Sequence, residues 1–280
     1  MSPLDKAEVL VEALPYIRRF GGQVVVIKYG GNATGDLRGF AEDVVLMRSV
    51  GIRPLVVHGG GPQIGELMKR LGKVPEFREG LRVTDAETLD IARMVLVGKV
   101  NREIVSAINL HAPIAVGLSG EDAGLITATA RHPDLGFVGD VEDVNPELVS
   151  RLLAEELIPV VATIATDAAG QAYNINADTA AGAIAEAVGA KKLVYLTDVE
   201  GVRRVSTDPS TLIPEVTPDE LEGLLADGAI GEGMIPKVRS CVRAVRSGVG
   251  QAHIVDGRAP HALLVEFFTA EGIGTMVSAT

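Results

Sequence analysis

Several residues that could act on a charged substrate fall where predicted strands and loops end. They are Lys28, the glycines of the HGGGP turn (His58 to Pro62), Arg82, Asn174, Asp178 and Lys237. Isolated cations and bare backbone N–H groups stabilise the negative charge that spreads over a phosphoryl group during its transfer. Phosphoryl transfer needs little covalent chemistry from the protein, so the lack of an evident nucleophile fits it. The pattern therefore predicts a phosphoryl-transfer centre.

Hydrolytic and metal-dependent chemistries fit the sequence less well. The stretch GLSGE (Gly117 to Glu121) departs from the G-x-S-x-G nucleophile elbow because Glu121 replaces the final glycine, so Ser119 is not a convincing hydrolase nucleophile. The five histidines show no metal-ligand spacing, and no protein metal site is expected. A carboxylate acceptor would already be ionised at neutral pH, since its reference pKa is about 4, and it would need no general base.

The stretch VVVIKYGG (Val24 to Gly31) is the element that must position Lys28. Its consecutive β-branched residues, bounded by glycine pairs, predict a strand buried on both faces at the centre of a parallel sheet. Ligands of open α/β sheets bind beyond the carboxyl ends of the strands, where Lys28 stands. From this stretch alone, Lys28 is explained equally well as a ligand contact or as a buried lysine whose ammonium group reaches water.

The HGGGP turn follows a second predicted strand, Pro54 to Val57, which comes after a helix expected from Leu37 to Ser49. This order is a βαβ crossover, which brings both glycine-rich turns to the same edge of the sheet. The turn does not fit G-x-G-x-x-G because Ile64 occupies the last position, and no P-loop motif occurs, which disfavours Rossmann dehydrogenases and P-loop enzymes. We interpret the glycines as an anion site at the start of a helix, with a plain tight turn as the alternative.

Two further polar residues have alternative interpretations. Arg82 lies in a predicted hairpin or irregular segment (Phe77 to Thr84), where it is either a solvated strand residue or a carboxylate clamp. Asp178 follows a short predicted strand. There it or Thr179 is expected to cap an alanine-rich helix, although the carboxylate of Asp178 could instead hold lysines in place.

The two ends of the chain carry apolar patterns of their own. Apolar residues from Val9 to Ile17 recur at helical spacing, and Pro15 is expected to kink or break that helix. The helix either packs on its own domain or docks as an arm on a second subunit. Near the C-terminus, His253 to Val255 and Leu263 to Phe267 are both expected to be strands that close the sheet.

The composition indicates an ordinary globular protein. Of the 280 residues, 47% are hydrophobic and 22% are charged, which argues against disorder. The formal net charge of -11, without a dense Lys/Arg block, argues against nucleic-acid and membrane-surface binding. No apolar run approaches the roughly 18 residues of a membrane span, and the acidic N-terminus does not fit a secretory signal. With a single cysteine, Cys241, a reducing, cytoplasmic location is expected.

The order of motifs along nearly the whole chain resembles that of the N-acetylglutamate kinases, a family within the amino-acid kinase superfamily. The motifs are KYGGNA (28–33), VHGGGP (57–62), GLRVTD (80–85), GLSG (117–120), NINADTAAGAIA (174–185), LTDVEG (196–201), GMIPK (233–237) and HIVDGR (253–258). Each is weak alone, but the full ordered set is specific. The resemblance implies an α/β fold, a three-layer αβα sandwich with a mainly parallel central sheet. It also implies ATP-dependent phosphorylation of the side-chain carboxylate of N-acetyl-L-glutamate in arginine biosynthesis.

The resemblance further implies roles for the residues at matching positions. Lys28 and Lys237 would stabilise the transferring phosphoryl group, and Asp178 would orient both lysines. The pocket for N-acetyl-L-glutamate would be formed by Gly60, Gly61, Arg82 and Asn174, with Arg82 on the α-carboxylate. The nucleotide-binding turns would be formed by Gly30, Gly31, Thr197, Asp198 and Gly201. Mg²⁺ would arrive with ATP.

The resemblance also divides the chain into parts and implies a form of regulation. Residues 1–20 would form an N-terminal oligomerisation helix, residues 21–180 a lobe that binds acetylglutamate, and residues 181–280 a lobe that binds ATP and arginine. In arginine-inhibited members, such N-terminal helices interlace dimers into a homohexamer. An inhibitory L-arginine site is accordingly expected near Tyr16, His253, Glu266 and Gly272, with the Glu266 carboxylate as guanidinium partner. Two other functions stay open: a kinase for carrier-linked aminoadipate or glutamate, and a non-catalytic sensor of amino acids or nucleotides on the same fold.

Overall fold

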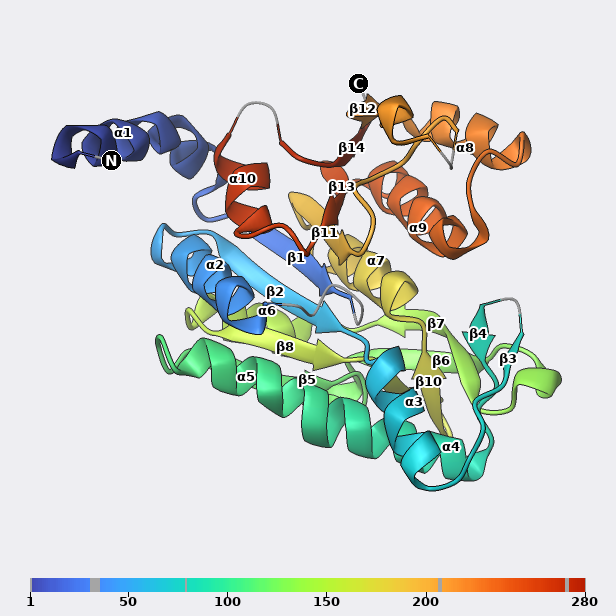
Figure 1. Cartoon of the computed structure of the whole chain (residues 1–280). Helices are drawn as coiled ribbons and strands as arrows, with labels where there is room; N and C mark the ends of the chain where they lie inside the picture. The colour runs from blue at the N-terminus through green and yellow to red at the C-terminus, as the bar shows by residue number, and fades with distance from the viewer. Residues whose placement is uncertain (1, 31–35, 79, 206–207, 270–271, 280) are drawn as a thin grey trace.

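A central eight-stranded sheet organises the chain (Figure 1). The computed structural model describes residues 2–30, 36–78, 80–205, 208–269 and 272–279. The strand order is β12-β14-β13-β11-β1-β2-β8-β5, and neighbours run parallel except β13 and β14. The strands are β1 (Val24–Tyr29), β2 (Arg53–His58), β5 (Ala115–Ser119), β8 (Ile158–Ala162), β11 (Lys192–Thr197), β12 (Glu215–Val216), β13 (Gln251–Asp256) and β14 (Thr275–Ser278). The predicted mainly parallel sheet is thus confirmed.

Strand β1 lies in the middle of this sheet, between β2 and β11. Val25 and Ile27 belong to the hydrophobic core on one face, and Val26 belongs to the core on the other. All three side chains are fully buried. Because successive side chains of a strand point to opposite faces, an unbroken run of β-branched residues fits only a strand covered on both sides. The predicted doubly buried strand is therefore confirmed.

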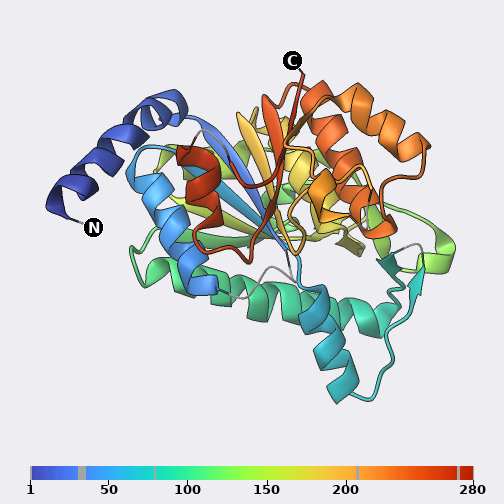
Figure 2. The same cartoon turned by 45° about the horizontal axis from the view of Figure 1, so that its top comes forward.

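Helices cover both faces of the sheet (Figures 1 and 2). One face packs against α2 (Leu37–Ser49), α5 (Asn101–Asn109) and α10 (Ala262–Phe268). The other packs against α6 (Glu147–Ala154), α7 (Ala177–Ala187) and α9 (Ile235–Arg246), with α8 (Pro218–Ala226) beside α9. This is the expected three-layer αβα sandwich.

Smaller elements surround the carboxyl ends of β1 and β2. They are α3 (Gly61–Arg70), the hairpin β3 (Phe77–Arg78) and β4 (Leu81–Arg82), and α4 (Ala86–Arg93), which continues through a π-helix (Met94–Val100) into α5. A small closed barrel is formed by β6 (Ile126–Ala130), β7 (Val138–Val144), β9 (Ile164–Thr166) and β10 (Ala172–Ile175). Short 3-10 turns occupy Asp122–Gly124, Pro133–Leu135, Pro209–Thr211 and Glu232–Met234.

Helix α1 (Pro3–Phe20) projects from the body of the molecule (Figure 2). Its N-cap is Ser2, which forms a capping box with Asp5. The helix is not broken at Pro15, because a proline removes one backbone donor while the remaining turns and the cap hold the helix together. The described helices include none that is long and apolar enough to span a membrane.

The expectation that Leu263 to Phe267 forms a strand is wrong. The segment is helix α10, and β14 closes the sheet instead. Leu263 and Phe267, four residues apart, lie on one helical face and are both buried. The buried carboxylate of Asp43 on α2 hydrogen-bonds with the backbone at the start of α10, which supplies partners for N–H groups that a helix start leaves open. A contact between distant segments thus stabilises the helix.

Candidate active site

Asp178 sits between the two isolated lysines. Lys28 Nζ lies 2.9 Å from Asp178 Oδ1, and Lys237 Nζ lies 3.1 Å from Asp178 Oδ2. All three side chains are largely buried, with 9%, 8% and 15% of the side chain exposed for Lys28, Asp178 and Lys237. Lys28 comes from the carboxyl end of β1, Asp178 from the first turn of α7, and Lys237 from the first turn of α9. Two positive charges are thereby fixed beside each other by one carboxylate.

The start of α7 leaves this carboxylate available. The N-cap of α7 is Asn176, whose side-chain oxygen accepts the backbone N–H groups of Asp178 (2.9 Å) and Thr179 (3.1 Å). The expectation that Asp178 or Thr179 caps the helix is therefore wrong. An aspartate that capped its own helix would point at backbone N–H groups, whereas Asp178 points at the lysines.

The lysines hold the Asp178 carboxylate in its ionised form. Burial alone raises the pKa of Asp178, but the charges of Lys28 and Lys237 outweigh it and hold the pKa below its usual value. Asp178 is consequently ionised and cannot act as a proton donor near pH 7. The centre carries a net positive charge, as a binding place for a phosphoryl group requires.

A cavity of about 210 Å³ opens beside this centre and brings the predicted substrate residues together. Lys28, Asp178, Gly60, Gly61, Arg82 and Asn174 all line it. The lining also includes polar Thr163 and Asn176 and the ring of Phe77, which sequence reasoning missed. Thr163 follows β8 directly, so a polar residue at a strand end was the signal that could have found it.

The glycine turn starts α3 without a side-chain cap. Gly60 is the N-cap residue and makes no capping hydrogen bond, so backbone N–H groups at this helix start remain available for an anion. A Cβ on Gly60 would lie 2.7 Å from Leu96 Cδ2 of the π-helix. A side chain at this position would have to displace Leu96, so glycine allows the turn to pack closely on the π-helix.

His58 supports the turn from the end of β2. Its Nδ1 lies 3.0 Å from Gly59 O and its Nε2 lies 3.1 Å from Asn101 Nδ2. Complete burial and the nearby Arg102 charge lower the pKa of His58 to about 4, although the Gly59 bond opposes this. The ring is neutral at pH 7, so Nδ1–H donates to Gly59 O and Nε2 accepts from Asn101.

Arg82 stands across the cavity with its guanidinium largely buried. It donates to Gly61 O at 2.8 Å and lies over the Phe77 ring, 4.7 Å from the ring centroid. Burial lowers the pKa of Arg82 from its usual range. No carboxylate forms an ion pair with Arg82 among the described residues, which leaves its charge for a ligand. The interpretation of Arg82 as a solvated strand residue is wrong, since only 9% of the residue is exposed.

The predicted nucleotide turns lie at the ends of β1 and β11. A Cβ on Gly30 would be 2.6 Å from Leu196 O and 3.3 Å from Lys28 Nζ, so its close approach is to the neighbouring strand and to the lysine itself. Thr197 Oγ1 donates to Asp198 Oδ1 at 3.2 Å. Gly201 packs against β14, where a Cβ would meet Thr275 Oγ1 at 2.5 Å. Gly31 lies outside the described residues.

A second cavity, of about 550 Å³, brings together the four residues predicted for arginine. Tyr16, His253, Glu266 and Gly272 all line it. His253 Nδ1 lies 2.5 Å from Glu266 Oε1, and the backbone N–H of Ile273 donates to Glu266 Oε2 at 3.0 Å. The buried Nε2 of His253 has no hydrogen-bond partner in the described part of the chain. A polar atom left unpaired in this way indicates a place for a ligand or water.

Lys192 is a residue of the second cavity that sequence reasoning missed. Its ammonium group lies 4.7 Å from the Phe20 ring centroid and 4.8 Å from that of Phe267, and burial lowers its pKa to about 8. A lysine at the start of a predicted buried strand was the available signal. Its charge faces the Glu266 carboxylate, which raises the Lys192 pKa against the effect of burial.

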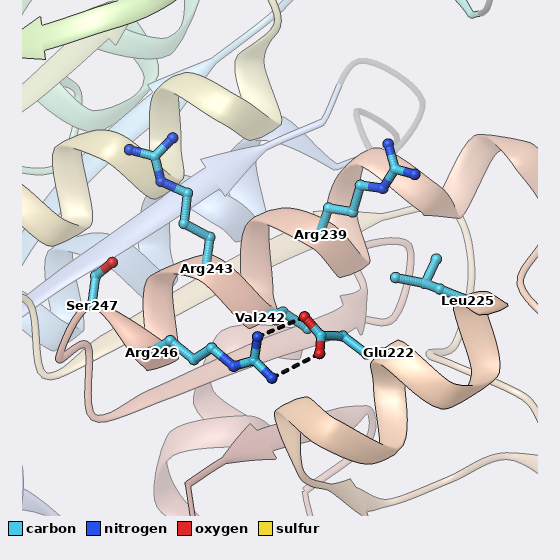
Figure 3. Close-up of a pocket in the computed structure, with 7 residues that line it drawn as sticks. All are labelled: Glu222, Leu225, Arg239, Val242, Arg243, Arg246 and Ser247. Atoms are coloured by element: carbon cyan, nitrogen blue, oxygen red, sulfur yellow. Dashed lines mark hydrogen bonds and ion pairs between the residues drawn. The ribbon is translucent and has the colours of Figure 1, made fainter.

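A third hollow, between α8 and α9, contains none of the predicted residues (Figure 3). It has a volume of about 540 Å³, and the exposed Arg246 pairs there with Glu222 through two contacts of 2.6 and 2.8 Å. Exposed pairs of this kind contribute little to stability or binding. No group of three or more histidine, cysteine, aspartate and glutamate side chains in the described ranges is arranged to hold a metal ion.

Comparison with known proteins finds similar sequences and similar structures. The sequence model of the Amino acid kinase family matches residues 23–256. A protein named acetylglutamate kinase from Symbiobacterium thermophilum is 55% identical over 98% of each chain. An N-acetylglutamate synthase from Neisseria gonorrhoeae, solved with coenzyme A and N-acetyl-glutamate, superposes with a TM-score of 0.86 at 27% identity, over 97% of this chain. The same synthase solved with coenzyme A and L-arginine gives 0.83 at 28% identity. This chain spans 63% and 65% of those synthase chains.

Proposed function

The chain belongs to the amino acid kinase family, and on this premise we propose that it transfers the γ-phosphoryl group of ATP to the side-chain carboxylate of N-acetyl-L-glutamate. One observation carries the proposal. Lys28 and Lys237 are both held on Asp178, and Lys28 and Asp178 line the cavity that also contains the glycine turn and Arg82. Transfer to a carboxylate that is already ionised needs positioning and charge neutralisation, which this arrangement supplies.

Different residues of the first cavity bind different parts of the substrate in this proposal. The Arg82 guanidinium grips the α-carboxylate, since its planar fork matches carboxylate geometry, and Asn174 on β10 completes that end of the pocket. Backbone N–H groups at Gly60 and Gly61 bind the anionic end that reacts. Lys28 and Lys237 stabilise the charge on the transferring group, and Asp178 orients them.

ATP approaches from the side of β11, in this proposal. Gly30 follows β1 close to Lys28 Nζ, and Thr197, Asp198 and Gly201 lie at or after the end of the neighbouring strand β11. Mg²⁺ enters bound to the ATP phosphates, because it is usually held by one or two carboxylates plus substrate phosphates rather than by a protein cage. Residues 21–180 then form the acetylglutamate lobe and residues 181–280 the ATP lobe. The division falls inside α7, next to Asp178.

We also propose that L-arginine binds the second cavity as a feedback inhibitor. The buried pair of His253 and Glu266 provides an acceptor for a guanidinium, and the unpaired His253 Nε2 provides another polar contact. Tyr16 places α1 at the edge of this cavity. Helix α1 also exposes five large apolar side chains, which a second copy of the helix would bury in a homohexamer: Leu4, Val9, Leu10, Val11 and Leu14. The reducing environment expected for the buried Cys241 is consistent with a cytoplasmic enzyme.

The test is turnover of purified full-length protein with free N-acetyl-L-glutamate and MgATP, followed by titration with L-arginine. We expect formation of an acyl phosphate, trapped as a hydroxamate, and its suppression by arginine. A rival kinase for carrier-linked aminoadipate or glutamate would require the carrier, so no turnover with the free substrate would contradict our proposal. A non-catalytic sensor would bind ligands without consuming ATP, and the paired lysines argue against it.

A further inference from the structure

Two buried hydroxyl groups meet at the backbone carbonyl of Asp178. The Tyr195 hydroxyl lies 2.6 Å from Ser240 Oγ and 3.1 Å from Asp178 O, and Ser240 Oγ lies 3.0 Å from the same carbonyl. Tyr195 is fully buried and Ser240 nearly so. Buried hydroxyls are costly without partners, so this geometry holds β11, α7 and α9 in one relative arrangement.

The hydrogens can be assigned from the number of donors. Each hydroxyl donates one hydrogen, while the Asp178 carbonyl can only accept. The shortest contacts are satisfied when Tyr195 donates to Ser240 and Ser240 donates to Asp178 O. If the Ser240 hydroxyl is removed, Tyr195 is already within hydrogen-bond distance of the carbonyl and can donate to it directly. The two hydroxyls therefore replace one another in part.

The same elements hold the carboxylate end of Asp178. Tyr195 is the register partner of Lys28 in the parallel pair of β11 and β1, so both side chains leave the sheet on the same face. Ser240 follows Lys237 by three residues on α9 and lies on the same side of that helix. The backbone carbonyl of Asp178 is thus contacted by one residue from β11 and one from α9. Its carboxylate is contacted by one residue from β1 and one from α9.

Gly182 on α7 makes this close approach of α9 feasible. A Cβ at Gly182 would lie 2.4 Å from Ser240 Oγ. Glycine inside a helix lowers helix stability, and the contact with Ser240 supplies the reason for its presence here. The contact between Gly182 and the Ser240 hydroxyl thus determines how closely α7 and α9 pack, one helical turn from Lys237.

We propose that Tyr195 and Ser240 are positioning residues for phosphoryl transfer. By holding α9 and β11 on the Asp178 carbonyl, they keep Lys237 and Lys28 at the distances from the Asp178 carboxylate that the reaction uses. The inference rests on the proposed kinase function. Loss of the two hydroxyls should affect kcat rather than KM, because Arg82 and the glycine turn, which bind the acceptor substrate, lie on other elements. A small displacement of a reacting group, in contrast, slows turnover strongly.

The test compares Tyr195→Phe, Ser240→Ala and the double variant. Because one hydroxyl can replace the other, we expect each single variant to lower kcat by about 1.5-fold or less, and the double variant to lower it by about tenfold or more, with both KM values within about twofold. Ser247→Ala, on the exposed end of α9, and Tyr173→Phe, whose hydroxyl contacts Asp167, are matched controls expected to keep wild-type kcat. An unchanged kcat in the double variant, or a loss equal to the product of the single losses, would overturn the proposal.

A filled variant separates positioning from folding. Tyr195→Phe/Ser240→Ala/Gly182→Ala lacks both hydroxyls, but the methyl group introduced at Gly182 occupies the space near the former Ser240 Oγ and raises the helix propensity of α7. We expect thermal unfolding close to that of the unmodified chain and a kcat still about tenfold lower. A stable filled variant with wild-type kcat would contradict the positioning role. No turnover by the unmodified chain would instead refute the proposed function, and the positioning role would fall with it.

Discussion

Asp178 and Glu266 are both buried carboxylates that contact cationic or ionisable side chains, but the two sites differ in the kind of side chain that each carboxylate contacts. Asp178 lies between two lysines, at 2.9 and 3.1 Å. Glu266 contacts His253 at 2.5 Å and accepts from a backbone N–H. Burial lowers the pKa of His253 more than its bond to Glu266 raises it, and the nearby Lys192 has a pKa of about 8. The Asp178 carboxylate is thus paired with two lysines, whereas the Glu266 carboxylate is paired with a histidine whose pKa is lowered by burial.

This difference matches what each cavity is proposed to do. Stabilisation of a phosphoryl group requires cations that are already oriented and charged when the substrate reacts. A site that binds and releases a regulatory ligand needs polar atoms that are free before binding, such as His253 Nε2. The features to test are therefore the ion pairs of Asp178 with two lysines at one site and the unpaired polar atom at the other.

The largest effect is expected for Lys237→Ala. Removing one of two cations that contact the transferring group should lower kcat by about 10³-fold, since single donors to developing charge contribute about 10²–10³. ATP binding, measured by calorimetry, should change much less because Lys28 and the nucleotide turns remain. Lys191→Ala, an exposed lysine before β11, is the control and should keep wild-type kcat. An unchanged kcat for Lys237→Ala would remove its assigned role.

The next effect concerns stability at the two carboxylates. Asp178→Asn leaves two buried lysines without a compensating charge and should lower the free energy of unfolding by about 3 kcal/mol. Glu266→Gln should cost about 1 kcal/mol, because a neutral His253 can still hydrogen-bond to an amide. Urea unfolding at pH 7 measures both. Equal losses would show that the two sites do not differ as their partners suggest.

The third prediction separates α1 from the second cavity. Deleting residues 1–14 removes the exposed apolar part of α1 but keeps Tyr16 and the buried Phe20, which contacts Phe267 edge-on at 5.5 Å between ring centroids. We expect sedimentation to show loss of the hexamer. Activity assays should show weaker inhibition by arginine, with kcat near that of the full chain. A shortened protein that still sediments as a hexamer would refute the interlaced arrangement of helices.

A further effect, spread over several pH units, is a pH dependence from Lys192. Its pKa is depressed from 10.5 to about 8 in the folded chain, so between these values the unfolded chain binds more protons. Stability attributable to Lys192 should therefore rise with pH across this window, by on the order of 1 kcal/mol per pH unit, and the cost is fully present below about pH 8. Lys192→Met should lack this rise. The measurement is the difference in unfolding free energy between the two proteins from pH 7.5 to 10.5, and parallel curves would contradict it.

Local sequence patterns predicted much of the fold. The run Val24 to Tyr29 indicated a doubly buried strand because its side chains are apolar on both faces, and glycines after β1 and β2 indicated open turns at a sheet edge. Patterns failed where a distant segment decided the outcome. The short apolar run Leu263 to Phe267 fits a strand as well as a helix. The Asp43 carboxylate, far away in sequence, hydrogen-bonds at the start of the segment and stabilises the helix.

The sequence by itself determined which residues could form the core and which cations and glycines would stand at strand ends, since these follow from periodicity and residue type over short stretches. Only the tertiary structure decided which polar groups meet. The N-cap of α7 is Asn176 rather than Asp178, so the Asp178 carboxylate is available to pair with Lys28 and Lys237. The tertiary structure also brought Lys192 to the second cavity and the Tyr195 and Ser240 hydroxyls to one carbonyl. Such contacts depend on strand register and helix packing, which no local pattern encodes.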